Sequence, residues 1–278
     1  VRFQTTPEYY RLCRKFNVDS LRGIHWALNI ECTINALIRK ERLLQYPAGT
    51  ALAGVQREFE LDQKRSESER WIREISYLGI KKDISRYFVI CITQKQASAF
   101  RDCAHIQMDL SFKMVHGQTN LYSVVGLNEI THEIDTFAYV FLNWETTEAY
   151  FKLFSRMFYW LGRISGTPVR FKHIHGPNPD HIGRPVSTAT LDMCKKQAHG
   201  LGQYLHGLDP SKSWQEHLPH VVIFCKVHLV RGFHSKYPKC DLGSFMDQIF
   251  GSPSKERLNE LMKAAIHLYP GEITSRSV

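Results

Sequence analysis

Residues 105–115, HIQMDLSFKMV, alternate between polar and apolar side chains. Every second position from Ile106 to Met114 is apolar, and Asp109 belongs to the polar set between them. Successive side chains of a β-strand point to opposite faces of a sheet, so this pattern predicts a strand with one buried face. We therefore expect the carboxylate of Asp109 in mid-strand, on the polar face.

The segments that follow predict a layered α/β fold. Residues 121–127 and 134–142 are apolar and flank a turn at 128–132, which is typical of an antiparallel meander with the first strand. Thr146 is the expected N-cap of an amphipathic helix that stops near 162–168. Shorter segments then predict strands at 171–175, 187–191 and 220–224 and a helix at 193–205. The main elements thus come in the order of three strands, a helix, a strand, a helix and a strand. This order is typical of an α/β layer.

The composition is that of a folded, basic chain. Its 278 residues include 36 Lys plus Arg and 27 Asp plus Glu, a net charge of +9, and 43% are hydrophobic, which argues against intrinsic disorder. No apolar run approaches the roughly 20 residues of a membrane helix, so we expect no membrane partner. Seven irregularly spaced cysteines without a signal peptide predict reduced thiols inside a cell. Because the chain begins with Val1, we expect a fragment or a processed chain.

The uneven distribution of charge along the chain predicts segments of different character. Residues 1–100 carry a net charge of +6 and residues 101–278 only +3, whereas every histidine except His25 lies after residue 100. We expect a basic, mainly helical segment at 1–100, which is a candidate for DNA binding. An α/β core at 101–240 and a helical C-terminal segment at 241–278 should follow. The first segment has predicted helices at 19–46, 58–77 and 93–104. The charged face of the helix at 58–77 either faces solvent or contacts DNA.

Two carboxylates are candidates for a catalytic metal site. Asp109 lies on the first strand of the core, and Asp192 follows the predicted strand at 187–191. If these strands are neighbours, both carboxylates emerge at one sheet edge and can hold Mg²⁺, which prefers carboxylate oxygens. Two such ions about 4 Å apart stabilise the attacking and leaving oxygens of a phosphoryl transfer. The alternative is that each Asp is an ordinary strand-end or capping residue, and spacing alone does not decide between the two.

Five short motifs occur in an order that resembles the catalytic domain of Mutator-like element (MULE) transposases. They are MDLSFKM (108–114), YSVVGL (122–127), FLNWETTEAYF (141–151), ATLDMCKKQA (189–198) and FCKVHLVR (224–231). The resemblance covers residues 105–235. It implies a ribonuclease H-like (retroviral integrase) fold and a DDE-type transposase that cuts DNA and transfers the strand with two Mg²⁺ or Mn²⁺ ions. It also implies DNA as partner, a homo-oligomer when active, and a nuclear location.

The resemblance also suggests roles for single residues. Asp109 and Asp192 match the first and second metal-binding acids of the family, and Cys225 and His228 match its C-x-x-H pair. Glu145 matches a Glu that precedes the first helix, for which we expect a supporting role.

The third acid of the family comes on a late helix, after an inserted helical segment. The resemblance implies that residues 241–278 are the truncated start of this insertion, and no residue here clearly matches the acid. Glu256 and Glu260 lie in a predicted helix at 254–268, where surface positions are expected, and Glu272 follows. We expect the third acid beyond residue 278. Two hypotheses remain, a DNA transposase and a catalytically incomplete or co-opted fragment that binds DNA or protein. A nuclease on the same fold is a third, less favoured because such enzymes lack the C-x-x-H pair.

Two further groups have alternative interpretations. Cys225 and His228 could form a zinc site with His234 and Cys240, but without a second tight ligand pair we favour a packing or site-supporting role over zinc. A loop cluster of His173, His175 and His181 could bind metal; exposed polarity or contact with DNA phosphate is the favoured interpretation.

Overall fold

The computed structural model describes residues 7–20, 30–49, 51–78, 86–112, 114, 118–129, 131–176, 182–192, 194–236, 243–252 and 254–268. The chain divides into two compact units, Val1–Ile75 and Ser76–Val278. This division lies before the boundary near residue 100 that charge and pattern predicted. In the described part of the chain, no helix is both long and apolar enough to cross a membrane.

The described residues of the first unit form the helices α1 (Pro7–Lys15), α2 (Glu31–Gln45) and α3 (Leu52–Asp62). Side chains of α1 and α2 form a small core of Tyr9, Leu12, Cys13, Ile34 and Ile38. The predicted helix at 19–46 is confirmed only from Glu31 onward, because Asp19 and Ser20 are not helical and Ile30 has an extended backbone. Residues 21–29 lie outside the described residues.

The prediction of one exposed helix at 58–77 is wrong. Helix α3 ends at Asp62, a turn region follows, and Ile72–Tyr77 forms strand β1. The reason is the Asp62 side chain, which is buried and accepts the backbone N–H groups of Trp71 and Ile72, each at 2.9 Å. A carboxylate that satisfies two backbone donors nine and ten residues away competes with a continuous helix, in which those donors would pair locally.

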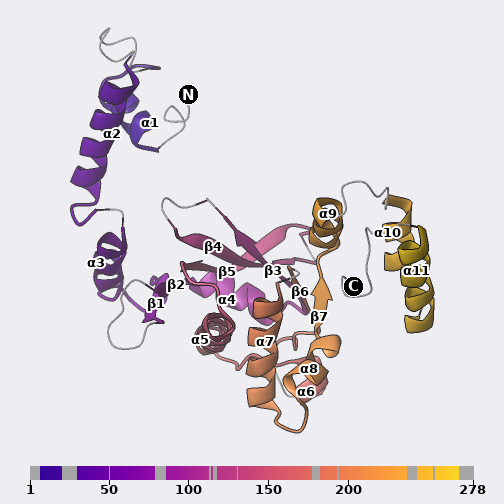
Figure 1. The fold of residues 1–278 in the computed structure, drawn as a ribbon. Coiled ribbons are helices and arrows are strands. Elements are labelled where there is room, and N and C mark those ends of the chain that lie inside the picture. The colour runs from indigo at the N-terminus through magenta and orange to yellow at the C-terminus, as the bar shows by residue number, and fades with distance from the viewer. Residues whose placement is uncertain are drawn as a thin grey trace. The chain divides into compact units, whose positions relative to one another are not determined.

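The second unit is an α/β layer (Figure 1). Its strands are β2 (Tyr87–Cys91), β3 (His105–Ser111), β4 (Asn120–Leu127), β5 (Ile134–Leu142), β6 (Thr188–Leu191) and β7 (Val222–Phe224). Its helices are α4 (Gln94–Arg101), α5 (Thr147–Ser165), α6 (Lys172–His175), α7 (Lys195–Leu208), α8 (Trp214–His217), α9 (Lys226–Lys236), α10 (Gly243–Phe250) and α11 (Lys255–Leu268), with a 3-10 turn, η4 (Leu218–His220).

Seven strands of the described chain form one mixed sheet, in the order β1-β2-β5-β4-β3-β6-β7. Strand β4 is antiparallel to both β3 and β5, which confirms the predicted meander, and β2 extends it antiparallel to β5. On the other side, β6 runs parallel to β3, and β7 runs parallel to β6. The predicted α/β class with a mixed sheet and flanking helices is therefore confirmed.

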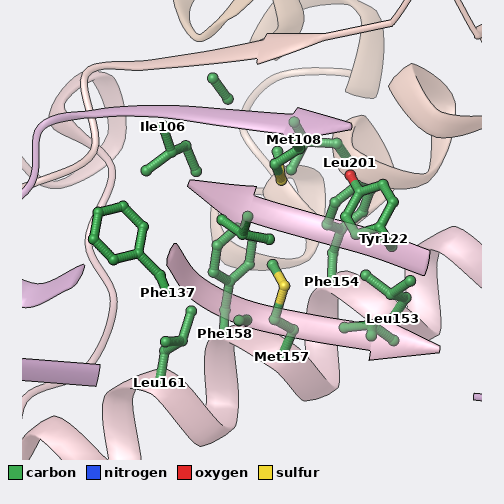
Figure 2. Packing of buried hydrophobic residues seen from close by; sticks show 14 of the residues in the cluster. Ile106, Met108, Tyr122, Phe137, Leu153, Phe154, Met157, Phe158, Leu161 and Leu201 are labelled. Atoms are coloured by element: carbon green, nitrogen blue, oxygen red, sulfur yellow. The ribbon is translucent and has the colours of Figure 1, made fainter. Parts of the chain in front are cut away.

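One face of the sheet carries the core. Ile106 and Met108 of β3 are buried against the apolar stripe of α5, and Figure 2 shows Phe154, Met157 and Phe158 of that helix packed beneath the strands. The helix begins as predicted, because the Thr146 side chain accepts the backbone N–H of Ala149. It ends at Ser165, within the predicted stop at 162–168.

Two further predictions fail at the ends of elements. Phe112 and Met114 were expected on the buried face of the first strand, but β3 ends at Ser111 and both side chains are exposed. The strand predicted at 171–175 is a single bridge between Phe171 and Val186, followed by helix α6.

The helix predicted at 93–104 is confirmed as α4, with a capping box between Thr93 and Gln96.

Gly200 allows α5 and α7 to approach each other closely, and its replacement by Ala is expected to destabilise the second unit. A Cβ there would lie 2.6 Å from the Cβ of Tyr150 and 2.8 Å from the backbone N of Phe151. Because neither atom can rotate away, we expect Gly200→Ala to cost about 1–3 kcal/mol in urea unfolding. Gly207→Ala on the same helix is the control, since nothing lies within 4 Å of that position. Equal stability of the two variants would contradict this packing.

Candidate metal centre

The register of β3 and β6 places Asp109 and Asp192 at the same level of the sheet. Gln107 pairs with Thr190 across these parallel strands, and each aspartate lies two residues further along its own chain. Residues two apart share a face of a strand, so both carboxylates belong to the face opposite the helix-covered core. The predicted convergence of the two acids at one sheet edge is therefore present in the structure.

His228 joins the two carboxylates from the first turn of α9. The Cys225 backbone N–H donates to the Leu191 oxygen at 2.8 Å, which extends the β6–β7 pairing, and α9 begins at the next residue. Oxygen atoms of Asp109 and Asp192 and a ring nitrogen of His228 all lie within 4.8 Å of one another. Two carboxylates and one imidazole are thus arranged as a group that could hold a metal ion.

One imidazole atom in this group lacks a hydrogen bond. His228 Nδ1 lies 2.9 Å from Asp192 Oδ1 and is covered from solvent, but the approach does not have the direction of a hydrogen bond. A poorly aligned contact is weak, so this nitrogen gains little from Asp192 as a hydrogen-bond partner. A ring nitrogen that is covered from solvent, lies beside a carboxylate and makes no hydrogen bond fits a metal ligand.

The electrostatics of the site also fit a cation. Burial and the neighbouring Asp109 carboxylate raise the pKa of Asp192, while His228 and the backbone N–H of Leu110 oppose the rise. Ser111 Oγ donates to Asp109 Oδ2 at 3.3 Å. Two partly buried carboxylates that face each other repel, and a divalent cation between them removes this repulsion.

Three helix N-termini lie at this same edge of the sheet. Helices α5, α7 and α9 follow directly on strands β5, β6 and β7, which all end there (Figure 1). The free backbone N–H groups and the positive ends of helix dipoles attract anions such as phosphate. The edge therefore combines a candidate cation site with groups that favour an anionic ligand.

Two other predicted residues lie at this edge but outside the group of three. Glu145 Oε1 accepts from Asn120 Nδ2 at 2.7 Å, at the ends of β5 and β4. Cys225 directly follows β7 as Asp192 directly follows β6, but it does not belong to the group of Asp109, Asp192 and His228 found among the described residues. His234 lies on α9 and is not in the group either, and Cys240 is outside the described residues.

The candidates for a third acid are not brought to the site in the described part of the chain. Glu256 and Glu260 lie on α11, and Glu260 pairs with Arg257 on the same helix at 2.9 Å. Neither belongs to the group around Asp192. Glu272 lies outside the described residues.

The predicted histidine cluster has different members from those expected. His173 Nε2 lies 3.0 Å from His217 Nδ1, and the His220 ring stacks on His173 with centroids 5.4 Å apart. His175 instead accepts the Phe171 backbone N–H, and His181 is outside the described residues. The sequence pattern could not find His217 and His220, because they come from α8 and η4, over 40 residues away.

The protonation of this cluster follows from its contacts. His217 Nε2 lies 2.9 Å from the Asp209 carbonyl oxygen, which only accepts, so that nitrogen carries the proton. Neutral His217 Nδ1 is then an acceptor, and His173 Nε2 donates to it. His173 Nδ1 is left as a buried nitrogen without a hydrogen-bond partner. Burial and the neighbouring His217 and His220 lower the pKa of His173 to about 4.

We expect this histidine to make the fold sensitive to acid. The pKa of His173 is about 4 in the folded chain against 6.5 for the ordinary side chain, so the unfolded chain binds the proton first. The contribution of neutral His173 to stability is therefore complete above pH 6.5 and is lost as the pH falls toward 4. Between pH 7.5 and 4.5, the Tm of the His173→Gln variant should fall by less than the Tm of the unmodified chain. His267→Gln, at an exposed position of α11, is the control, and parallel Tm curves for His173→Gln and the unmodified chain would contradict the assignment.

The role of His228 as a partner of the carboxylates was not evident from the sequence. The C-x-x-H spacing indicated a pair, whereas the structure separates its members, since Cys225 ends the strand pairing and His228 lies beside Asp192 on the helix.

Comparisons with protein-family models, curated proteins and solved structures return no match to this chain.

Proposed function

We propose that this chain carries a metal-dependent phosphoryl-transfer site that acts on DNA, as in a DDE-type transposase. The observation that carries the proposal is the convergence of Asp109, Asp192 and His228 at one sheet edge. Carboxylate pairs of this kind hold the ions that activate water and stabilise the leaving oxygen in phosphoryl transfer. The motif resemblance to MULE transposases specifies the reaction as strand cleavage followed by strand transfer.

We further propose that the sheet belongs to the ribonuclease H-like fold. Its support is the element order, in which the antiparallel meander β3-β4-β5 is followed by α5, β6, α7 and β7. Asp109 then lies on β3, and Asp192 directly follows the parallel neighbour of that strand, β6. This is the arrangement that the resemblance leads us to expect.

In this proposal the residues of the site have distinct tasks. Asp109 and Asp192 would hold Mg²⁺ or Mn²⁺, and His228 would supply a nitrogen ligand. When bound, such an ion polarises the scissile phosphate and lowers the pKa of the attacking water. The N-termini of α7 and α9 attract the phosphate to the edge. Ser111 holds the Asp109 carboxylate through its hydroxyl.

The proposed partner is DNA, with a second copy of the chain in the active complex and a location in the nucleus. The net charge of +9 supports a polyanionic partner, because lysines and arginines that neutralise phosphates release counterions. The remaining support for these points is the resemblance itself.

A non-catalytic DNA-binding or protein-binding role is the second candidate. It is favoured by the ligand set, since the group of three in the described residues contains only two carboxylates, with an imidazole in the third place. This alternative predicts DNA binding that weakens with salt and no metal-dependent cleavage.

A cleavage assay separates the two candidates. The full chain is incubated with supercoiled plasmid and with terminal-repeat oligonucleotides in Mn²⁺, in Mg²⁺ or in EDTA. Nicks and joined strands that require the metal are the expected result. Salt-dependent binding without any nick would support the binding module, and neither binding nor cleavage would contradict both candidates.

A further inference from the structure

The three ligand atoms of the metal centre have the spacing of a single coordination shell. One oxygen of Asp109, one oxygen of Asp192 and a ring nitrogen of His228 all lie within 4.8 Å of one another. Ligand atoms about 2.1 Å from an octahedral ion lie about 3.0 Å apart when adjacent and about 4.2 Å apart when opposite. The distance of 2.9 Å between His228 Nδ1 and Asp192 Oδ1 is close to that of adjacent ligands. The group is therefore compact enough for one ion.

The backbone fixes the position of the imidazole beside the carboxylates. The Cys225 backbone N–H donates to the oxygen of Leu191, the residue before Asp192, at 2.8 Å, and α9 begins directly after Cys225. The Leu229 backbone N–H donates to the Cys225 oxygen at 3.0 Å and closes the turn that carries His228. The ring is thus attached through main-chain hydrogen bonds to the strand end that carries Asp192.

A direct interaction with Asp192 does not account for the place of this ring. A protonated Nδ1 would donate to the carboxylate, but the contact lacks the direction of a hydrogen bond. In the neutral tautomer with its proton on Nε2, Nδ1 of His228 presents a lone pair. A lone pair that is covered from solvent and lies beside a carboxylate is unfavourable, because both groups accept hydrogen bonds and neither donates. A cation that binds both atoms removes this conflict.

A nitrogen ligand changes which ions a site prefers. Mg²⁺ and Ca²⁺ take oxygen ligands, whereas imidazole suits divalent ions of the first transition series, with affinities that rise from Mn²⁺ through Co²⁺ to Cu²⁺. Carboxylates alone serve Mg²⁺, Ca²⁺ and Mn²⁺. Because the group in the described residues has an imidazole as its third member, that side chain decides the balance between the two classes of ion.

We propose that His228 determines the class of metal ion at this centre. Its nitrogen makes the site bind divalent ions of the first transition series, such as Mn²⁺ and Co²⁺, in preference to Mg²⁺ and Ca²⁺. The inference rests on the proposed function, because it uses the same metal centre, and it adds the chemical class of the ion. It also gives the imidazole the role of a ligand, distinct from a packing role.

The test uses His228→Asn, since the Asn amide can place an oxygen near the position of Nδ1 but has no nitrogen lone pair to offer. Isothermal calorimetry on the full chain without DNA measures Co²⁺ and Mg²⁺ in separate titrations. Co²⁺ binding should weaken by at least about tenfold, because loss of outer-shell partners alone costs about 10- to 100-fold in metal affinity. Mg²⁺ affinity should change by less than about twofold, because an oxygen ligand suits this ion.

The matched control is His234→Asn. His234 is an exposed residue of the same helix, α9, and does not belong to the group of three. Its variant should bind Co²⁺ and Mg²⁺ with the affinities of the unmodified chain. A loss of Co²⁺ affinity in His234→Asn equal to that in His228→Asn would count against the inference.

A spectroscopic readout identifies the ligand atom itself. Mn²⁺ bound to the unmodified chain should show the nitrogen modulation of a coordinated imidazole in electron spin-echo measurements, and His228→Asn should abolish it. Unchanged modulation in this variant, or a loss of Co²⁺ and Mg²⁺ affinity by the same factor, would overturn the inference. Those results leave a carboxylate metal centre and its cleavage activity in place, whereas failure of the proposed function appears as absent cleavage with the preference for Co²⁺ intact.

Discussion

Replacing Asp192 with Asn is expected to lower the rate of metal-dependent DNA cleavage by at least about a thousandfold. The amide keeps the shape of the side chain but removes the negative charge that faces the cation. A catalytic metal supplies several kcal/mol of transition-state stabilisation, and about 4 kcal/mol corresponds to a thousandfold change in rate. Asp109→Asn should have an effect of the same size, because both carboxylates belong to one group. The measurement is the initial rate of plasmid nicking in Mn²⁺.

The matched control for these variants is Asp102→Asn. Asp102 is also an aspartate of the second unit, but it is exposed and pairs with Arg101 at 3.0 Å, outside the group. We expect its cleavage rate to equal that of the unmodified chain. Nicking that persists in Asp192→Asn, or falls equally in Asp102→Asn, would remove the carboxylates from the reaction.

The second large effect is expected on stability, at the centre of the core. Phe154 is fully buried, and its ring stacks on those of Tyr150 and Phe158, with centroids 6.3 and 6.1 Å away. Phe154→Ala removes these contacts and leaves a cavity between α5 and the sheet, which costs about 3–5 kcal/mol. Because small domains are stable by only about 5–15 kcal/mol, the unfolding midpoint in urea should fall markedly.

Phe151→Ala is the control for this prediction. Phe151 lies on the same helix but is 36% exposed, so its loss should change the free energy of unfolding by less than about 1 kcal/mol. Similar unfolding midpoints for the two variants would mean that α5 does not pack on the sheet through the face containing Phe154.

The elements around the site could be predicted from the sequence because their signals are local. The alternation around Asp109 and the apolar stripe after Thr146 each depend on a single strand or helix. The segment after Asp62 could not be predicted in this way, since its conformation depends on a buried carboxylate that binds backbone groups of Trp71 and Ile72. Contacts between residues nine and ten apart leave no periodic pattern.

The candidate site was predictable in part for the same reason. Asp109 and Asp192 could be paired because each stands at a strand, and neighbouring parallel strands bring their ends to one edge. The place of His228 depends on where α9 begins and how it crosses the end of β7, which spacing does not encode. The exposure of Phe112 and Phe224 likewise depends on where the strands end.

The central claim is that Asp109, Asp192 and His228 together hold a divalent cation, and a Mn²⁺ titration tests it most directly. Isothermal calorimetry on the full chain without DNA should show a binding site for Mn²⁺. In the Asp109→Asn/Asp192→Asn double variant this site should be lost or at least about tenfold weaker, because two carboxylates supply most of the charge that Mn²⁺ requires. Identical Mn²⁺ affinity and stoichiometry in the double variant and the unmodified chain would contradict the claim.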